Sequence, residues 1–338
     1  MRPSRVPVAV VGAGVKTPAG NDVGELWENL STGRPSAEVF EDDRLPQGAA
    51  ALVCRVSGFD PGTYLTPVEV RRLDRSHALA IGAAADALAQ CGELPVPARR
   101  AVVCGIGLGA AATYEEQVSR LLERGAHGVS PLTIPMVMPS SVAAHLSLRF
   151  GFGGPCLTVS AACASGAAAI GEGVELLRRG AADIVLAGGV DSLVNYGAMC
   201  CFMRLDAMSR NVSCPGLASR PFDTDRDGFV MGEGAGFVVL QRLEDVRASG
   251  PVPRRALDDV EVEVRVDGPE AGDRGDQAIA QGDQAHDRLH RPGSGDHVAC
   301  RALDGRDRRA GPRKKGREGG GFGVVVKHCT GAMRVDVR

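Results

Sequence analysis

The chain has 338 residues, a formal net charge of −2 and 44% hydrophobic residues, which is enough for one or two buried cores. The charge indicates neither a nucleic-acid nor an anionic-membrane partner, and no apolar run reaches the roughly 18–20 residues of a membrane span. Ten cysteines without a CxxC pair, and an N terminus without an export signal, favour free thiols in the cytoplasm over a disulfide framework. No Cys/His cluster has zinc-ligand spacing.

Residues 1–250 predict one α/β unit in which apolar strands alternate with helices. We expect strands over 6–15, 99–109, 157–162 and 182–192, and helices over 21–33, 76–92, 113–125 and 164–179. Asn21 is the expected N-cap of the first helix, and 228–243 is expected to form a hairpin that returns to the sheet. The alternation favours a mostly parallel sheet with helices on both faces.

Residues 251–338 have a different composition. Leu, Ile, Phe and Val together supply 16 of these 88 residues, and Tyr and Trp are absent. A chain with so few apolar side chains cannot bury enough surface to offset its ordering entropy. The sequence therefore predicts two regions: a folded unit over 1–250, and a low-complexity, Arg/Gly/Asp-rich tail over 251–338 that is poorly ordered.

Cys163 stands where an expected strand turns into an expected helix, within "LTVSAACASGAAAIGEG". The unpaired N–H groups and the dipole of a helix N terminus stabilise a thiolate. Its neighbours Ala162, Ala164 and Gly166 permit a sharp turn and a close approach of substrate. The backbone N–H of Cys163 is itself a candidate oxyanion donor. This pattern predicts a nucleophile, and a small core residue is the alternative interpretation.

Four segments resemble the β-ketoacyl-acyl-carrier-protein synthases, the condensing enzymes of the thiolase-like superfamily. They are "VVGAGVKTPAGNDVGELWENLSTGRP", "PMVMPSSVAAHLSLRFGFGGP", "GPCLTVSAACASGAAAIGEG" and "RPFDTDRDGFVMGEGAGFVVL". The resemblance extends from about residue 6 to 250. It implies an α/β thiolase-like fold, layered α-β-α-β-α, whose N-terminal half is complete and whose C-terminal half is degenerate or missing.

The resemblance implies a decarboxylative Claisen condensation in fatty acid or polyketide biosynthesis. Cys163 would take an acyl chain from acyl carrier protein or coenzyme A, and the carbanion formed from a malonyl thioester would then attack the acyl-cysteine. The implied partners are acyl carrier protein and a second subunit, in a homodimer or a ketosynthase heterodimer, with no cofactor and no metal. By position in the family, Gly107 and Leu108 would gate the acyl pocket, and Phe202 would lie near its mouth.

The resemblance also implies two catalytic histidines, in His-Gly-Thr and Gly-His-x-x-Gly-Ala motifs, that stabilise the enolate. Neither motif occurs among the seven histidines, and in the similar fragment "VVVKHCTGAM" Ala332 occupies the histidine position. Two interpretations of the activity therefore remain. The chain is either an active condensing enzyme or a catalytically impaired, truncated or partner-type subunit. A thiolase is a more distant alternative, which the segment 220–240 disfavours.

The second half also prompts a hypothesis about the gene. Four lysines against 35 arginines indicate a GC-rich coding sequence, and such DNA read out of frame yields Arg, Gly, Asp, Ala and Pro. We hypothesise that residues from about 251 onward are not the family's second half in its proper frame. Sequencing the gene is expected to reveal both histidine motifs in another frame after codon 250; their absence from both other frames would contradict the hypothesis.

Overall fold

A computed structural model of the chain describes residues 6–45 and 51–248 and four short strands farther along. These strands are β8 (Val262–Val264), β9 (Lys327–His328), β10 (Gly331–Ala332) and β11 (Val335–Val337). Strands β9 and β10 pair antiparallel. Apart from these strands, the predicted tail over 251–338 and the prediction of its poor order lie outside the described residues.

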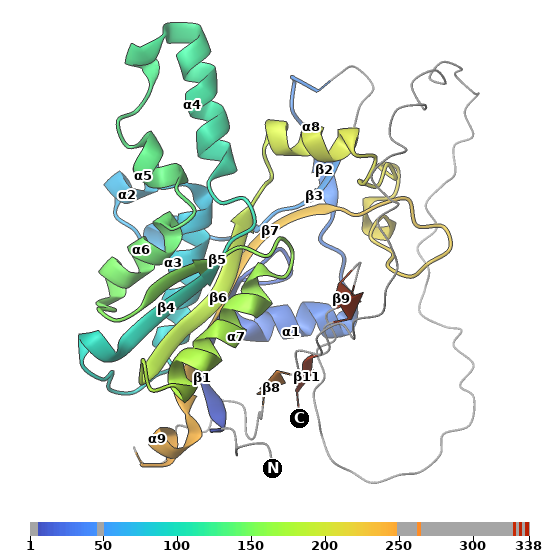
Figure 1. Cartoon of the computed structure of the whole chain (residues 1–338). Helices are drawn as coiled ribbons and strands as arrows, with labels where there is room; N and C mark the ends of the chain where they lie inside the picture. Colours follow the sequence, from blue (N-terminus) through green and yellow to red (C-terminus); the bar gives the residue numbers. More distant parts are fainter. Residues whose placement is uncertain are drawn as a thin grey trace, which may run out of the picture. The chain divides into compact units, whose positions relative to one another are not determined.

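A seven-stranded sheet forms the centre of residues 6–248 (Figure 1). Its strand order is β2-β3-β7-β6-β4-β5, and β1 pairs with β7. The strands are β1 (Val8–Lys16), β2 (Glu38–Phe40), β3 (Ala51–Cys54), β4 (Arg100–Gly105), β5 (Cys156–Val159), β6 (Ile184–Ser192) and β7 (Met231–Arg242).

The sheet is mixed, which corrects the expectation of a mostly parallel one. Strands β5 and β6 both run parallel to β4, and β3 runs parallel to β7. Strand β7 runs antiparallel to β1 and β6, and β2 runs antiparallel to β3. The expected hairpin over 228–243 is also wrong, because Met231–Arg242 is one continuous strand of 12 residues. Its Gly234 and Gly236 do not form a turn; they line the pocket described below.

Helices cover both faces of the sheet (Figure 1). Helices α3 and α6 pack on one face and α7 packs on the other. The α-helices are α1 (Val23–Thr32), α2 (Pro67–Arg72), α3 (Arg75–Leu88), α4 (Ala111–Arg124), α5 (Thr133–Val137), α6 (Ser141–Phe150), α7 (Ser165–Arg178), α8 (Tyr196–Arg204) and α9 (Leu243–Ala248). Short 3-10 turns are η1 (Pro61–Thr63), η2 (Pro97–Arg99), η3 (Ala126–Gly128) and η4 (Pro215–Leu217).

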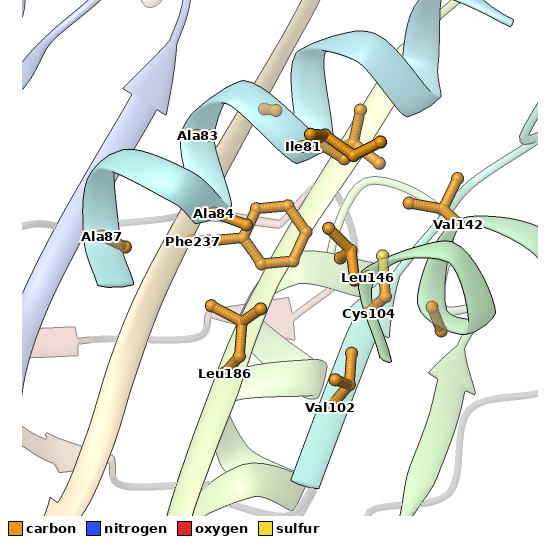
Figure 2. Packing of buried hydrophobic residues seen from close by; sticks show 14 of the residues in the cluster. Ile81, Ala83, Ala84, Ala87, Val102, Cys104, Val142, Leu146, Leu186 and Phe237 are labelled. Atoms are coloured by element: carbon orange, nitrogen blue, oxygen red, sulfur yellow. The ribbon is translucent and has the colours of Figure 1, made fainter. Parts of the chain in front are cut away.

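The two-residue repeat of a strand divides the core between the two faces. On β4, Val102 and Cys104 belong to the cluster under α3 and α6, whereas Ala101 and Val103 belong to the cluster under α7. Figure 2 shows the ring of Phe237 among the small side chains of α3 and Leu146 of α6. The predicted N-terminal half of the thiolase-like fold is therefore present as a helix layer, a sheet and a second helix layer.

The first helix begins one residue later than the sequence predicts. Its N-cap is Asp22, whose carboxylate accepts the N–H of Glu25 at 2.8 Å. The expected cap, Asn21, instead donates from Nδ2 to the carbonyl of Ser57 at 2.7 Å. Gly33 ends the helix in the left-handed conformation with a φ of 67°, as a C-terminal glycine commonly does. Asn and Asp are both favoured N-cap residues, so residue type alone could not distinguish Asn21 from Asp22 as the cap.

An ion pair between buried Glu233 and partly exposed Arg75 joins β7 to α3. The side chain of Glu233 is 1% exposed and accepts hydrogen bonds from Arg75 at 2.6 and 2.7 Å and from Ser192 at 2.7 Å. Burial acts to raise the pKa of Glu233, but these hydrogen bonds and one from the N–H of Val56 outweigh it and hold the pKa below its ordinary value. The carboxylate is thus charged and fully paired inside the fold.

A second buried polar group, His77 of α3, lies against α6. It is 1% exposed, and its Nε2 lies 2.8 Å from Oγ of Ser141. The ring packs edge-on against His145 with 4.9 Å between centroids. Burial, and then the nearby charge of His145, lower the pKa of His77 to about 4, against a smaller opposing effect of Asp74. The imidazole is therefore neutral in the folded chain at neutral pH.

This burial predicts a loss of stability in mild acid. The pKa of His77 is lower in the folded state than in the unfolded state. Neutral His77 therefore makes its full contribution to the free energy of unfolding above pH 6.5, and about 3 kcal/mol of it is lost as the pH falls toward 4. We expect His77→Gln to make the free energy of unfolding, measured by urea denaturation, change less between pH 7 and pH 4 than it does in wild type. His127→Gln, on an exposed 3-10 turn, is the control; equal acid sensitivity of the His77 variant and wild type would contradict the prediction.

Candidate active site

The turn between β5 and α7 carries Cys163. The strand ends at Val159 and the helix begins at Ser165, which places Cys163 where the sequence predicts it. The residue is exposed. Its neighbour Ala162 has a φ of 49°, a left-handed conformation that residues with a Cβ adopt at a cost of about 1–2 kcal/mol. The sharp strand-to-helix turn resembles the nucleophile elbow of serine hydrolases, with sulfur in place of oxygen.

Ser165 holds this strained turn through three contacts. Its Oγ accepts the N–H of Ala161 at 2.9 Å and donates to the carbonyl of Ala162 at 2.6 Å. Its backbone N–H donates to the same Ala162 carbonyl at 3.1 Å. Because Ser165 is only 4% exposed, these bonds are shielded from water. The turn can therefore present Cys163 in one fixed conformation.

Glycines let the N terminus of α7 lie directly on the sheet backbone. A Cβ on Gly105, at the end of β4, would lie 2.3 Å from the backbone carbon and oxygen of Ser165. A Cβ on Gly189, in β6, would lie 2.9 Å from Cα of Gly166. No larger residue fits at Gly105 or Gly189 unless the helix moves. The small residues around Cys163 thus serve helix packing as well as substrate access.

A pocket of about 320 Å³ opens at Cys163. Its lining combines the turn, the start of α7, and the ends of β4, β6 and β7: Gly105, Ala162, Cys163, Ser165, Gly166, Gly189, Val190, Asp191, Gly234 and Gly236. Five of these residues are glycines, which leave the space beside the thiol free of side chains. The volume lies in the range of small-ligand sites.

The structure brings two of the three other predicted site residues near this pocket. Gly107 and Leu108 follow β4, and both donate their backbone N–H groups to Asp191 of the pocket lining, at 2.8 and 3.1 Å. Phe202 lies on α8, half-buried, with its ring edge-on to Phe229 at 5.5 Å between centroids. Among the described residues that line the pocket, Phe202 does not appear. Its role at the pocket mouth stays a prediction.

Comparison with known proteins decides the family. A family profile described as beta-ketoacyl synthase, N-terminal domain, matches residues 5–246. The chain belongs to the beta-ketoacyl synthase family. A Streptomyces cyaneus protein named as a polyketide beta-ketoacyl synthase is 38% identical over 256 residues, and 3-oxoacyl-[acyl-carrier-protein] synthase 2 of Staphylococcus aureus strain MRSA252 is 33% identical over 249 residues. Each match covers 72% of this chain and 60% of the relative.

Solved ketosynthases share the fold. A beta-ketoacyl synthase of Burkholderia phymatum STM815 superposes with a TM-score of 0.67 at 29% identity, covering 77% of this chain and 64% of that one. A type II polyketide ketosynthase bound to its acyl carrier protein and a hexaketide gives a TM-score of 0.62 at 27% identity, covering 73% and 60%. The expected relationship and fold are therefore confirmed, and the matched region spans under two thirds of these relatives.

Burial makes four other thiols of this ketosynthase chain weaker acids. Burial raises the pKa of Cys91 to about 11, and it also raises the pKa of Cys54, Cys104 and Cys156 above the ordinary thiol value. A raised pKa leaves less nucleophilic thiolate at neutral pH. Seven cysteines of residues 6–45 and 51–248 are free, in line with the expectation, but Cys214 is disulfide-bonded and departs from it.

A metal site and a membrane-spanning helix are two features that residue types alone can suggest. Within the part of the chain that the structure describes, no group of three His, Cys, Asp or Glu side chains could hold a metal ion. In the same part, no helix is both long and apolar enough to cross a membrane.

Sequence reasoning missed Ser165 and Asp191. Ser165 lies two residues after Cys163, but a serine in a helix start has many ordinary uses. Asp191 is the next-to-last residue of the segment "ADIVLAGGVDS", and an acid at the carboxyl end of a buried strand marks the edge at which sites gather. The missing information was that β4 and β6 are neighbours, which brings Asp191 to the loop after β4.

The close contact between helix and sheet predicts opposite effects of one substitution at two glycines. Gly105→Ala forces α7 away from β4. We therefore expect the free energy of unfolding to fall by about 1–3 kcal/mol and the alkylation of Cys163 to become slower. Gly171→Ala, in the same helix and with no described atom within 4 Å of its Cβ, is expected to gain about 0.5–1 kcal/mol and leave alkylation unchanged. Thermal unfolding and thiol-trapping rates measure both; indistinguishable variants would contradict the packing argument.

Proposed function

We propose that this chain carries the nucleophile of a β-ketoacyl-[acyl-carrier-protein] synthase, with Cys163 as the residue that accepts the acyl chain. The observation that carries the proposal is the exposed Cys163 thiol at the start of α7, beside a pocket of about 320 Å³. An exposed thiol on a fixed turn can meet a large carrier-bound substrate. The family assignment of residues 5–246 supports the same chemistry.

In the loading step the Cys163 thiolate attacks the carbonyl carbon of an acyl thioester. The new carbon–sulfur bond forms as the carbonyl electrons move to oxygen, and the backbone N–H of Cys163 is proposed as one donor to that oxyanion. When the carbonyl re-forms, the bond to the carrier sulfur breaks and the carrier leaves as a thiolate, which takes up a proton.

In the condensing step a malonyl thioester loses CO2, and the electrons of that broken bond form the new carbon–carbon bond to the acyl-cysteine. The Cys163 thiolate leaves, and a β-ketoacyl thioester remains on the carrier. The enolate of this step carries negative charge on the thioester oxygen, which the family's two histidines stabilise. Because this sequence lacks both histidine motifs, the condensing step would proceed in this chain without that stabilisation, whereas the loading step does not require it.

The proposed partners are acyl carrier protein and a second ketosynthase subunit, identical or related. A solved relative is described in complex with its acyl carrier protein. Strand β5 ends the strand order of the sheet, and Cys156 and Leu157 on it are exposed. An edge strand with exposed side chains is open to pairing with another chain, which supports a dimer through this edge.

A second candidate function is a partner-type subunit that binds acyl carrier protein or a ketosynthase without extending a chain. The absence of the His-Gly-Thr and Gly-His-x-x-Gly-Ala motifs from the sequence favours it. The loss of enolate stabilisation would slow extension by about 10²–10³-fold for each missing donor. Acyl transfer to Cys163 does not require those donors.

Radiolabelled acyl-carrier thioester distinguishes the candidates. We expect one acyl group per chain on wild type and on Cys201→Ala, which removes another exposed thiol, and at least about tenfold less label on Cys163→Ala. Malonyl-carrier is then added separately. Extended product supports the complete synthase, and label retained on Cys163 without extension supports the partner-type subunit. Equal labelling of the Cys163 variant and wild type would show that another residue is the acceptor.

A further inference from the structure

One carboxylate holds the loop after β4. Asp191, in β6, accepts three consecutive backbone N–H groups: Gly107 at 2.8 Å on Oδ2, and Leu108 and Gly109 at 3.1 and 3.3 Å on Oδ1. Successive N–H groups that converge on one point form an anion-binding concavity. Here the anion is a side chain of the same fold. In residues 6–45 and 51–248, no Lys or Arg forms an ion pair with Asp191, and its carboxylate oxygens accept these three N–H groups instead.

The fit between Asp191 and the loop is tight. A Cβ on Gly107 would lie 2.7 Å from Oδ2 of Asp191, so an alanine there would displace the carboxylate or the loop. Gly109 has a φ of 71°, which a glycine adopts without strain. Leu108, between them, is 61% exposed. The carboxylate therefore holds the loop backbone while the Leu108 side chain projects outward.

The peptide unit between Ile106 and Gly107 joins this loop to the turn that carries Cys163. Its N–H is the one that donates to Oδ2 of Asp191, and its carbonyl lies 3.3 Å from Oγ of Ser165. The N–H of Ile106 donates to Val159, the last residue of β5, at 3.0 Å. Ser165 in turn bonds the backbone on either side of the strained Ala162 peptide. A single peptide unit thus lies between Asp191 and the nucleophile turn.

We propose that Asp191 is a positioning residue: it fixes the loop 107–109 beside the Cys163 pocket and thereby determines how readily a thioester with an alkyl chain reaches the thiol. The proposal rests on the proposed acyl-accepting function of Cys163. A loop held in one conformation requires no further ordering when a chain lies against it, whereas a released loop must be ordered at binding. A small reagent does not contact the loop, so its rate of reaction with Cys163 does not depend on the cost of ordering the loop.

Two alkylating reagents test the proposal on the full chain. Iodoacetamide and N-dodecyl iodoacetamide both form a carbon–sulfur bond with the thiolate and release iodide, and mass spectrometry of the peptide containing Cys163 gives each rate. We expect Asp191→Asn to lower the dodecyl rate about tenfold and to change the iodoacetamide rate less than about twofold. Asp191→Glu, which keeps the charge, is expected to recover part of the dodecyl rate.

Gly107→Ala disturbs the same contact from the loop side, and it replaces Asp191→Asn as the test variant if Asp191→Asn does not fold. It is expected to lower the ratio of dodecyl to iodoacetamide rates similarly, and the double variant to lower it little further. The control is Asp183→Asn, beside the opposite end of β6, which breaks ion pairs to Arg99 and Arg242 at 2.7 Å. We expect this variant to lose stability and keep the wild-type ratio.

An unchanged ratio in Asp191→Asn, or an equal fall in both rates, would overturn the proposal, because the first shows no role for the loop and the second only a structural one. Failure of the proposed function has a different signature. In that case carrier thioesters leave no label on wild-type Cys163, while Asp191→Asn still lowers the dodecyl rate relative to the iodoacetamide rate.

Discussion

The start of helix α7 lies in backbone contact with strands β4 and β6, and the position of Cys163 follows from that contact. Gly105 and Gly189 have no Cβ, so Ser165 and Gly166 can approach the strands more closely than any side chain would allow. The chain reaches this helix start through Ala162 in a left-handed conformation. Backbone geometry, fixed by packing, thus places Cys163 at the start of this helix.

The rest of the half-fold supports this contact. Glu233 and Arg75 join the central antiparallel strand β7 to α3, on the face opposite α7. The core under α3 and α6 and the core under α7 share the strands β4 and β6, whose side chains alternate between the two. Both cores therefore rest on the strands whose carboxyl ends lie beside Cys163.

The family relationship and the site together separate two chemical tasks. The groups that suit acyl transfer, namely an exposed thiol, a helix N terminus and a pocket lined by glycines, all come from residues 105–236. The groups that the family uses for decarboxylation have no counterpart in the sequence. The matched region also spans 60% of the curated relatives. Acyl loading and chain extension are therefore distinct proposals with distinct experimental outcomes.

The sequence by itself determined the family, the α/β alternation of residues 1–250 and the place of Cys163 between a strand and a helix. These are local properties, because hydrophobic period, turn residues and contiguous motifs are read along the chain. Only the tertiary structure decided that β7 runs antiparallel through the sheet, that its glycines line a pocket, and that Asp191 holds the loop after β4. Each of these depends on which strands are neighbours, and that pairing brings together residues 80 or more positions apart, such as Asp191 and Gly107, which no local pattern in a single sequence connects.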